Sequence, residues 1–129
     1  VFEKVCADWL TQKNAGGELP ILFTSVGRWW GTNPVTRSQE EIDLVAGDGK
    51  DYLFCECKWR NEKLDMSVLR GLKAKADVFG GKCNHIYFVL FSKTGFTDAV
   101  VEEAKKDSSI LLVDLEEIMR DTNDRTEEL

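Results

Sequence analysis

Histidine is almost absent from this 129-residue chain, which has only His85. One histidine excludes metal sites built from several histidines, including the His-Glu-x-x-His pattern of metalloproteases. The sequence also lacks the Gly-x-Ser-x-Gly elbow of serine hydrolases and the glycine-rich nucleotide loops Gly-x-x-x-x-Gly-Lys and Gly-x-Gly-x-x-Gly. We therefore set these classes aside and interpret His85, at the edge of an apolar strand, as a structural hydrogen-bonding residue.

Long apolar runs are absent too. None approaches the roughly 20 residues that a membrane-spanning helix needs, and no signal peptide is visible. We expect a cytoplasmic protein without membrane association, large enough to fold without disulfides or metal ions. Because a helical pattern is already present at Val1, we also expect the chain to be a piece of a longer protein.

The four cysteines do not have the spacing of a zinc site, because no Cys-x-x-Cys pair occurs. Cys55 and Cys57 are two residues apart on a predicted strand, so they share the face opposite Glu56. We interpret the cysteines as buried free thiols that pack as small hydrophobic residues, in preference to structural zinc ligands.

The stretch most informative about function contains a predicted hairpin. Ile42–Ala46 and Tyr52–Lys58 have the β-branched, aromatic and small apolar residues typical of strands, and Gly47–Lys50 is a turn between them. If the hairpin is centred between Gly49 and Lys50, facing residues have numbers that sum to 99.

This register places Asp43 opposite Glu56, with Lys58 beside Glu56 on the same face. Carboxylates about 5 Å apart on facing strands repel, by about 3 kcal/mol at an effective dielectric constant near 20. Lys58 neutralises only one of the two, so the pair indicates a further cation, and carboxylate oxygens suit Mg²⁺ or Mn²⁺. Apolar residues on both strand faces favour partial burial of these charges over a solvated surface.

The flanking segments predict an α/β fold in which a mixed central sheet is flanked by helices. We predict helices over residues 1–13, 64–79, 97–106 and 114–120, and further strands over residues 21–26, 85–91 and 110–113. This order is an αβββαβ core with a C-terminal αβ extension, and its crossover helix makes the 85–91 strand parallel to the second hairpin strand. Residues 1–120 are expected to form one domain and residues 121–129 a charged tail.

Of the adjacent Trp29 and Trp30, which point to opposite faces in a strand, one is expected in the core and the other partly exposed.

These residues resemble a known superfamily. The αβββαβ order, with Asp on one hairpin strand and Glu-x-Lys on the other, resembles the PD-(D/E)XK phosphodiesterases, which include many restriction enzymes and Holliday junction resolvases. More narrowly, Gly27–Gly31, Glu41–Ala46 and Glu56–Trp59 resemble the DUF234-type C-terminal domain of archaeal and bacterial predicted ATPases. The similarity extends from Phe2 to about residue 115. Ile42 replaces the superfamily's proline, but the metal needs the carboxylate and not the proline.

The resemblance implies a restriction-endonuclease-like fold and a Mg²⁺-dependent (or Mn²⁺-dependent) DNA nuclease joined to an ATPase. By this resemblance Asp43, Glu56 and the backbone carbonyl of Cys57 bind the metal. Glu3 is a further candidate ligand, and a plain surface glutamate is the alternative. Lys58 orients the attacking water or stabilises the developing negative charge. The alternative function is a catalytically silent module that binds nucleic acid or a protein partner for the ATPase.

The net charge of -6 is unusual for a DNA-binding protein, but the charges are unevenly distributed. Lys58 to Lys82 contains seven basic and three acidic residues, whereas residues 102–129 contain four basic and ten acidic ones. The basic segment follows the predicted site directly, and it is either a phosphate-binding surface or a solvated helix face. The candidate DNA-binding residues are Arg28, Arg37, Arg60, Lys63, Arg70 and Lys73.

Two of these residues have alternatives. Arg28 either binds phosphate or pairs with an acid of the hairpin, and Lys73 either reaches toward the site or covers apolar surface. DNA is therefore the expected partner, and association into a homo-oligomer is also considered.

Overall fold

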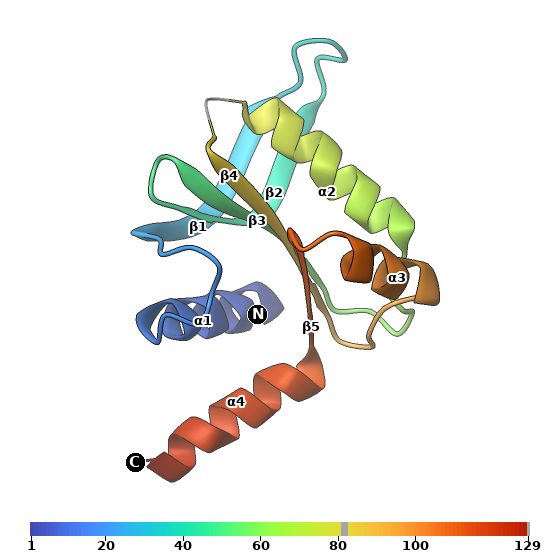
Figure 1. Cartoon of the computed structure of the whole chain (residues 1–129). Coiled ribbons are helices and arrows are strands. Elements are labelled where there is room, and N and C mark those ends of the chain that lie inside the picture. Colours follow the sequence, from blue (N-terminus) through green and yellow to red (C-terminus); the bar gives the residue numbers. More distant parts are fainter. Residues whose placement is uncertain (81–82, 129) are drawn as a thin grey trace.

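The computed structural model describes residues 1–80 and 83–128 of the chain. The elements follow in the order α1 (Phe2–Ala15), β1 (Ser25–Thr32), β2 (Gln39–Gly47), β3 (Asp51–Lys58), α2 (Met66–Phe79), β4 (His85–Ser92), α3 (Asp98–Lys106), β5 (Ile110–Asp114) and α4 (Leu115–Glu128) (Figure 1). The predicted αβββαβ core and its αβ extension are confirmed. Gly81 and Lys82 of the basic segment and Leu129 of the predicted tail lie outside the described residues.

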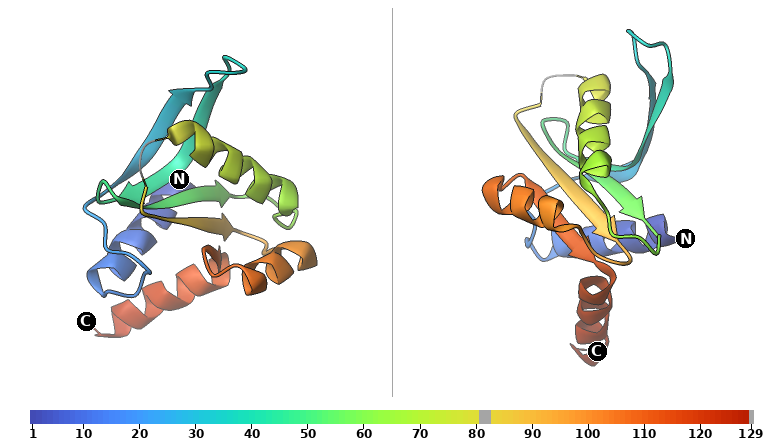
Figure 2. Two further views of the ribbon diagram at one scale, coloured as in Figure 1. Left: turned by 45° about the horizontal axis from the view of Figure 1, so that its top comes forward. Right: turned by 90° about the vertical axis from the view of Figure 1, so that its right-hand side faces the viewer.

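The five strands form one mixed sheet whose spatial order equals the chain order, β1-β2-β3-β4-β5. β2 is antiparallel to β1 and to β3, whereas β4 is parallel to β3, and β5 is parallel to β4. Crossovers of one hand place their helices on one face of a sheet. Accordingly, α2 and α3 pack on one face, and α1 and α4 pack on the other (Figures 1 and 2). The predicted α/β class with a mixed sheet is confirmed.

A hydrophobic cluster lies on each face of the sheet. β3 contributes to both because alternate residues of a strand point to opposite faces. Leu53 and Cys55 join the cluster under α1 and α4, and Phe54 joins the cluster under α2 and α3. The sheet is therefore covered on both sides, as its apolar residues predict, and any charge on β3 lies between packed layers.

The first strand is displaced from its predicted position. The apolar run Ile21–Val26 predicts a strand, but β1 begins at Ser25, so the prediction is wrong over residues 21–24. The side-chain amide of Asn14 donates to the carbonyl of Phe23 and accepts from its N–H, both at 2.9 Å. Because one side chain satisfies both backbone groups, this segment buries Ile21 and Phe23 without strand pairing.

The two adjacent tryptophans lie within β1 and point to opposite faces. Trp29 packs against the cluster under α2, whereas Trp30 is 56% exposed. The expectation of one core tryptophan and one partly exposed tryptophan is confirmed.

The last helix is longer than the sequence predicts. Asp114 caps it as expected, but α4 continues to Glu128 instead of ending at Arg120. Asp121 accepts a hydrogen bond from the indole Nε1 of Trp9 at 2.9 Å, so a tertiary contact with α1 supports this part of α4. No helix of the described residues, α4 included, is long and apolar enough to cross a bilayer.

Candidate active site at the carboxyl ends of the parallel strands

The residues that were predicted to act together lie at one end of the strands of the sheet. The carboxyl ends of β3, β4 and β5 lie at this end, and antiparallel pairing brings the beginning of β2 beside them. Open α/β sheets bind ligands at the carboxyl ends of their strands. Asp43 on β2 and the pair Glu56 and Lys58 on β3 lie at this end.

Asp43 lies where the ladder between β2 and β3 ends. The ladder runs from Gly47 paired with Tyr52 to Leu44 paired with Cys55, and every pair has numbers that sum to 99, as predicted. Beyond it, the backbone N–H of Cys57 donates to Oδ2 of Asp43 at 2.9 Å. The carboxylate thus replaces the main-chain acceptor that a longer ladder would offer.

A β-bulge occurs at the same position on the other side of β2. Arg28 of β1 alone lies opposite two residues of β2, Asp43 and Leu44. An extra residue in one strand interrupts strict alternation of side chains and bends the strand. The bulge explains why Ile42 packs under α2 although Leu44, two residues away, packs under α1.

Glu56 is the buried carboxylate of the site, with 2% of its surface exposed. Its Oε1 accepts a hydrogen bond from Nζ of Lys75 on α2 at 2.8 Å, and its Oε2 lies 3.7 Å from Nζ of Lys58. Burial raises the pKa of Glu56, the hydrogen bond from Lys75 lowers this pKa, and the nearby carboxylate of Asp43 raises it again. Asp43 and Glu56 are therefore close enough to interact.

Lys75 is a site residue to which the sequence assigned no role. Burial alone would lower the pKa of Lys75, but the hydrogen bond to Glu56 and the charges of Glu56 and Asp43 raise it overall. The ammonium group therefore stays protonated at neutral pH. One signal was available, because Lys75 lies in the basic segment and directly precedes Ala76 of the buried face of α2.

The charges of the site balance. Asp43 and Glu56 carry two negative charges, and Lys58 and Lys75 carry two positive ones. Lys58 alone does not balance the two carboxylates, as the sequence indicates. In this structure Lys75 supplies the second positive charge.

The oxygen atoms of the site fit a Mg²⁺ ion that keeps several of its waters. Mg²⁺ is typically bound through one or two carboxylates, and Asp43 and Glu56 supply two. The carbonyl of Cys57 lies on the same side of β3 as its N–H, toward β2. Within residues 1–80 and 83–128, no described side chains form a metal-binding group of three or more His, Cys, Asp or Glu. An ion would therefore depend on these two carboxylates and main-chain oxygen.

Glu3, the further candidate ligand, pairs instead with Arg28. The guanidinium of Arg28 binds Glu3, and its Nε lies 3.2 Å from Oε1 of Glu41. The hydrogen bond to Glu3 is the main cause of the raised pKa of Arg28, to which the charges of Glu41 and Asp43 also contribute. Of the two alternatives for Arg28, pairing with a hairpin acid is observed, and Glu3 pairs with the same guanidinium.

The other predicted DNA-binding residues are dispersed. Nζ of Lys73 lies 3.8 Å from Oδ2 of Asp107 and 5.7 Å from the ring centre of Phe88, so the first of its two alternatives, reach toward the site, is not observed. The alternative, coverage of apolar surface, describes Lys73. The exposed members of the set are Arg37, Arg60, Lys63 and Arg70.

The histidine and the cysteines have structural roles. Nδ1 of His85 lies 3.0 Å from Oδ1 of Asp51 at the opposite end of β3, which confirms its interpretation as a hydrogen-bonding residue. All four cysteines are free, and Cys6 and Cys55 are fully buried. A hydrogen-bonding contact with Cys6, together with burial, raises the pKa of the Cys57 thiol, which stays protonated.

Comparisons with known proteins give relatives without an assigned function. The DUF234 model, described as archaea bacterial proteins of unknown function, matches residues 1–70. The uncharacterized protein MJECL04 of Methanocaldococcus jannaschii is 34% identical over 121 residues, which cover 91% of this chain and 25% of that protein. This chain therefore spans a quarter of the length of that relative.

The crystal structure of the protein of unknown function AF1548 matches with a TM-score of 0.52 and 13% identity, over 92% of this chain and 66% of that one. This likeness shows a shared fold alone.

Proposed function

This chain belongs to the DUF234 family of archaeal and bacterial proteins, whose function is unknown, and we propose that it is a Mg²⁺-dependent phosphodiesterase domain that cleaves DNA. The observation that carries the proposal is the approach of Asp43 to the buried Glu56 at the carboxyl ends of parallel strands, with Lys58 alongside. Strongly perturbed carboxylates beside specific charge partners cluster at functional sites. A purely structural role gives no reason to place the partly buried carboxylate of Asp43 against the buried carboxylate of Glu56.

Each side chain has its own role in the proposed site. Asp43, Glu56 and the carbonyl of Cys57 hold Mg²⁺ or Mn²⁺, which when bound supplies a water of lowered pKa and neutralises charge on the scissile phosphate. Lys58 donates a hydrogen bond to the attacking water or to the negative charge that develops on the phosphate. Lys75 fixes the orientation of Glu56 through Oε1, which leaves Oε2 directed to Lys58. The N–H of Cys57 fixes Asp43 in the same way.

The domain is proposed to act within a longer cytoplasmic protein. This chain spans 25% of the length of its archaeal relative, and the resemblance noted above implies an ATPase in the remainder. DNA is the proposed substrate, and the linked ATPase is the proposed partner.

A second candidate is a module that binds DNA or a protein without cleaving it. The charge balance favours this candidate, because Lys58 and Lys75 neutralise Asp43 and Glu56 without any metal ion. The net charge of -6 and the acidic partners of Arg28 favour a protein over DNA as the partner of such a module.

A cleavage assay separates the two candidates. Labelled single-stranded, duplex and branched DNA are incubated with the wild type in Mg²⁺, Mn²⁺ or EDTA. We expect ion-dependent cleavage that falls by about 100-fold or more in both variants, because Asp43→Asn loses the charge of a proposed metal ligand and Lys58→Ala loses the donor to the attacking water or the phosphate. Lys73→Ala, on the same helix as Lys75 but paired with Asp107, is the matched control and should cleave normally. Absence of cleavage with either ion would leave the binding module as the function, whereas full activity of Asp43→Asn would refute the assignment of the site to Asp43 and Glu56.

A further inference from the structure

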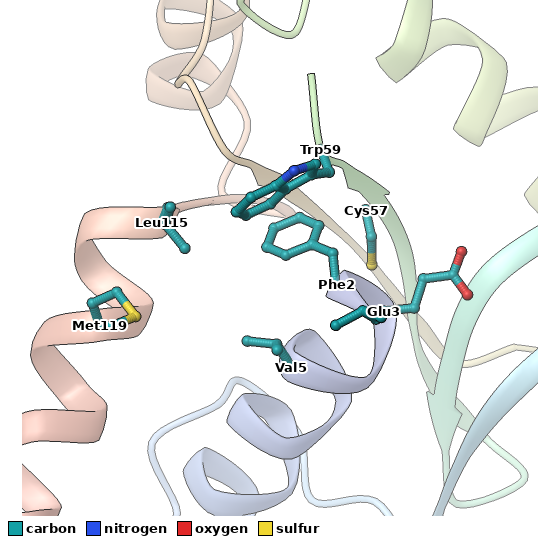
Figure 3. Close-up of a pocket in the computed structure, with 8 residues that line it drawn as sticks. Phe2, Glu3, Val5, Cys57, Trp59, Leu115 and Met119 are labelled. Atoms are coloured by element: carbon teal, nitrogen blue, oxygen red, sulfur yellow. The ribbon is translucent and has the colours of Figure 1, made fainter. Parts of the chain in front are cut away.

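An apolar groove of about 600 Å³ lies on the face of the sheet opposite Glu56. Its walls come from α1, the end of β3 and the beginning of α4, and they include Phe2, Val5, Cys57, Trp59, Leu115 and Met119. In Figure 3, Phe2 and Trp59 lie together on one side of the groove, and Leu115 and Met119 lie across from them. Trp59 is 55% exposed and Met119 51%, so large apolar side chains face solvent here. Such patches on a folded domain mark surfaces that bind a ligand or partner.

The groove and the proposed active site lie on opposite faces of the sheet, and both include residues from the end of β3. The side chain of Cys57 lines the groove, while its backbone N–H holds Asp43 on the adjacent strand. Lys58, the next residue, points to Glu56 on the other face, and Trp59 then returns to the groove. Three successive residues therefore connect the two places, and one chain-like ligand can contact both across the edge of the sheet.

The chemistry of the groove matches a flat aromatic ligand that carries negative charge. The ring of Trp59 lies 5.1 Å from the ring of Phe2, so the two form one aromatic wall. Nζ of Lys93, at the end of β4, lies 4.8 Å from the centre of the Trp59 ring and places a cation at the rim. Glu3 also lines the groove, and it shares the guanidinium of Arg28 with Glu41. Aromatic surfaces beside cations bind unpaired bases by stacking and their phosphates by charge.

We propose that this groove binds an unpaired nucleobase of the nucleic-acid strand whose phosphate lies at Lys58, and that Trp59 is its stacking surface. The volume of the groove is in the range of pockets that hold small ligands. A base that is paired within a duplex cannot enter the groove, so the substrates of the site are single strands and structures with unpaired nucleotides. The inference rests on the proposed function for the position of the phosphate. Base binding itself is measured without divalent ions, so the two proposals fail separately.

The test measures binding of a fluorescein-labelled twelve-nucleotide oligo(dT) by anisotropy in EDTA, with the 129-residue chain. We expect Trp59→Ala to weaken binding by about tenfold and Trp59→Phe by less, because stacking on one aromatic ring is lost or reduced. Trp30→Ala is the matched control, because Trp30 is 56% exposed and has the guanidinium of Arg28 at 5.7 Å from its ring but does not line the groove. It should bind within twofold of the wild type.

A second probe keeps the inference testable if Trp59→Ala folds poorly. An oligonucleotide in which abasic positions replace the thymines should bind the wild type about tenfold more weakly than oligo(dT), and Trp59→Ala should not distinguish the two. Equal binding of both probes by the wild type overturns the inference, as does a loss in Trp30→Ala equal to that in Trp59→Ala. Self-association that depends on Trp59 and excludes oligo(dT) also overturns it, because a second copy then occupies the groove. Binding that behaves as expected without any cleavage supports the groove and refutes the nuclease alone.

Discussion

Replacement of Lys75 by methionine tests whether this lysine compensates the buried carboxylate. The ion pair between Lys75 and Glu56 has an N–O distance of 2.8 Å, for which the Coulomb energy is about 6 kcal/mol at an effective dielectric constant of 20. Desolvation of both groups offsets much of this attraction, and the side chain of Lys75 keeps 29% of its exposure. Lys58 also remains near Glu56. We therefore expect a net loss of about 2 kcal/mol, or roughly 6 °C in Tm for a domain of this size.

The matched control is Lys73→Met, which makes the same substitution two residues earlier in α2. Lys73 pairs with Asp107 at 3.8 Å, and both side chains are more than a third exposed. An exposed pair of this kind contributes at most about 1 kcal/mol. Chemical and thermal denaturation at neutral pH measure both variants. A Lys75→Met variant as stable as Lys73→Met refutes the reasoning that Lys75 holds Glu56 in its charged form.

The loss in Lys75→Met should also depend on pH and on Mg²⁺. The pKa of Glu56 is already raised in the folded protein by burial, and loss of Lys75 removes a group that lowers it. A carboxyl whose pKa is raised by folding costs stability as pH rises through that pKa, so the variant should recover stability as pH falls.

If the carboxylates bind Mg²⁺, a tenfold excess over Kd adds about 1.4 kcal/mol, and the gain should be larger in Lys75→Met than in the wild type. An identical Mg²⁺ response in both proteins contradicts competition between the ion and Lys75.

Three further predictions concern the fold. Thr97→Ala removes the side chain that accepts from the N–H of Val100 at the start of α3 and should cost about 1 kcal/mol in urea unfolding; an unchanged midpoint contradicts this cap. Trp9→Phe removes the hydrogen bond to Asp121 and should cost about 1 kcal/mol; equal amide exchange in α4 would argue against the contact. Hydrogen bonds from Ser109 lower the pKa of Asp107, so its contribution is present above the ordinary carboxyl pKa and is lost as pH falls through the lowered value. Asp107→Asn should therefore lose less stability below about pH 4 than the wild type; parallel acid-unfolding curves contradict it.

The hairpin could be predicted from the sequence because local rules decide it. A Gly-Asp-Gly turn fixes the loop, and once the loop is centred a period of two determines every facing pair. The pairing of Leu44 with Cys55 follows. Asp43 lies beyond this last pair and still interacts with Glu56. The bulge opposite Arg28 could not be predicted, because it depends on how β1 pairs with β2 and leaves no mark on either strand alone.

The two misplaced elements have a common physical reason. Residues 21–24 look like a strand, but the amide of Asn14 satisfies the backbone of Phe23 and makes pairing unnecessary. α4 looks as though it ends at Arg120, but Trp9 of α1 supports it one residue later. In both places a side chain distant along the chain decides the outcome, and local propensity contains no information about that partner.

The choice between Lys73 and Lys75 could not be made from the sequence for a related reason. Both lie at the border of the apolar face of α2. The helical pattern alone does not decide which of them points toward Glu56. In the structure Lys75 reaches Glu56, while Lys73 faces Asp107. The sequence indicates the need for a second positive charge, but it does not identify Lys75 as the source.

The carboxylate of Asp43 keeps β2 and β3 from pairing beyond Leu44 and Cys55. Because it occupies the partner position of the Cys57 N–H, its removal frees β2 and β3 to pair further toward the sheet edge. An alanine at this position would therefore alter the backbone as well as the charge. Asparagine keeps an oxygen that accepts from the same N–H, so it removes the charge without letting β2 and β3 pair further. Only the asparagine variant therefore tests the role of the charge in cleavage.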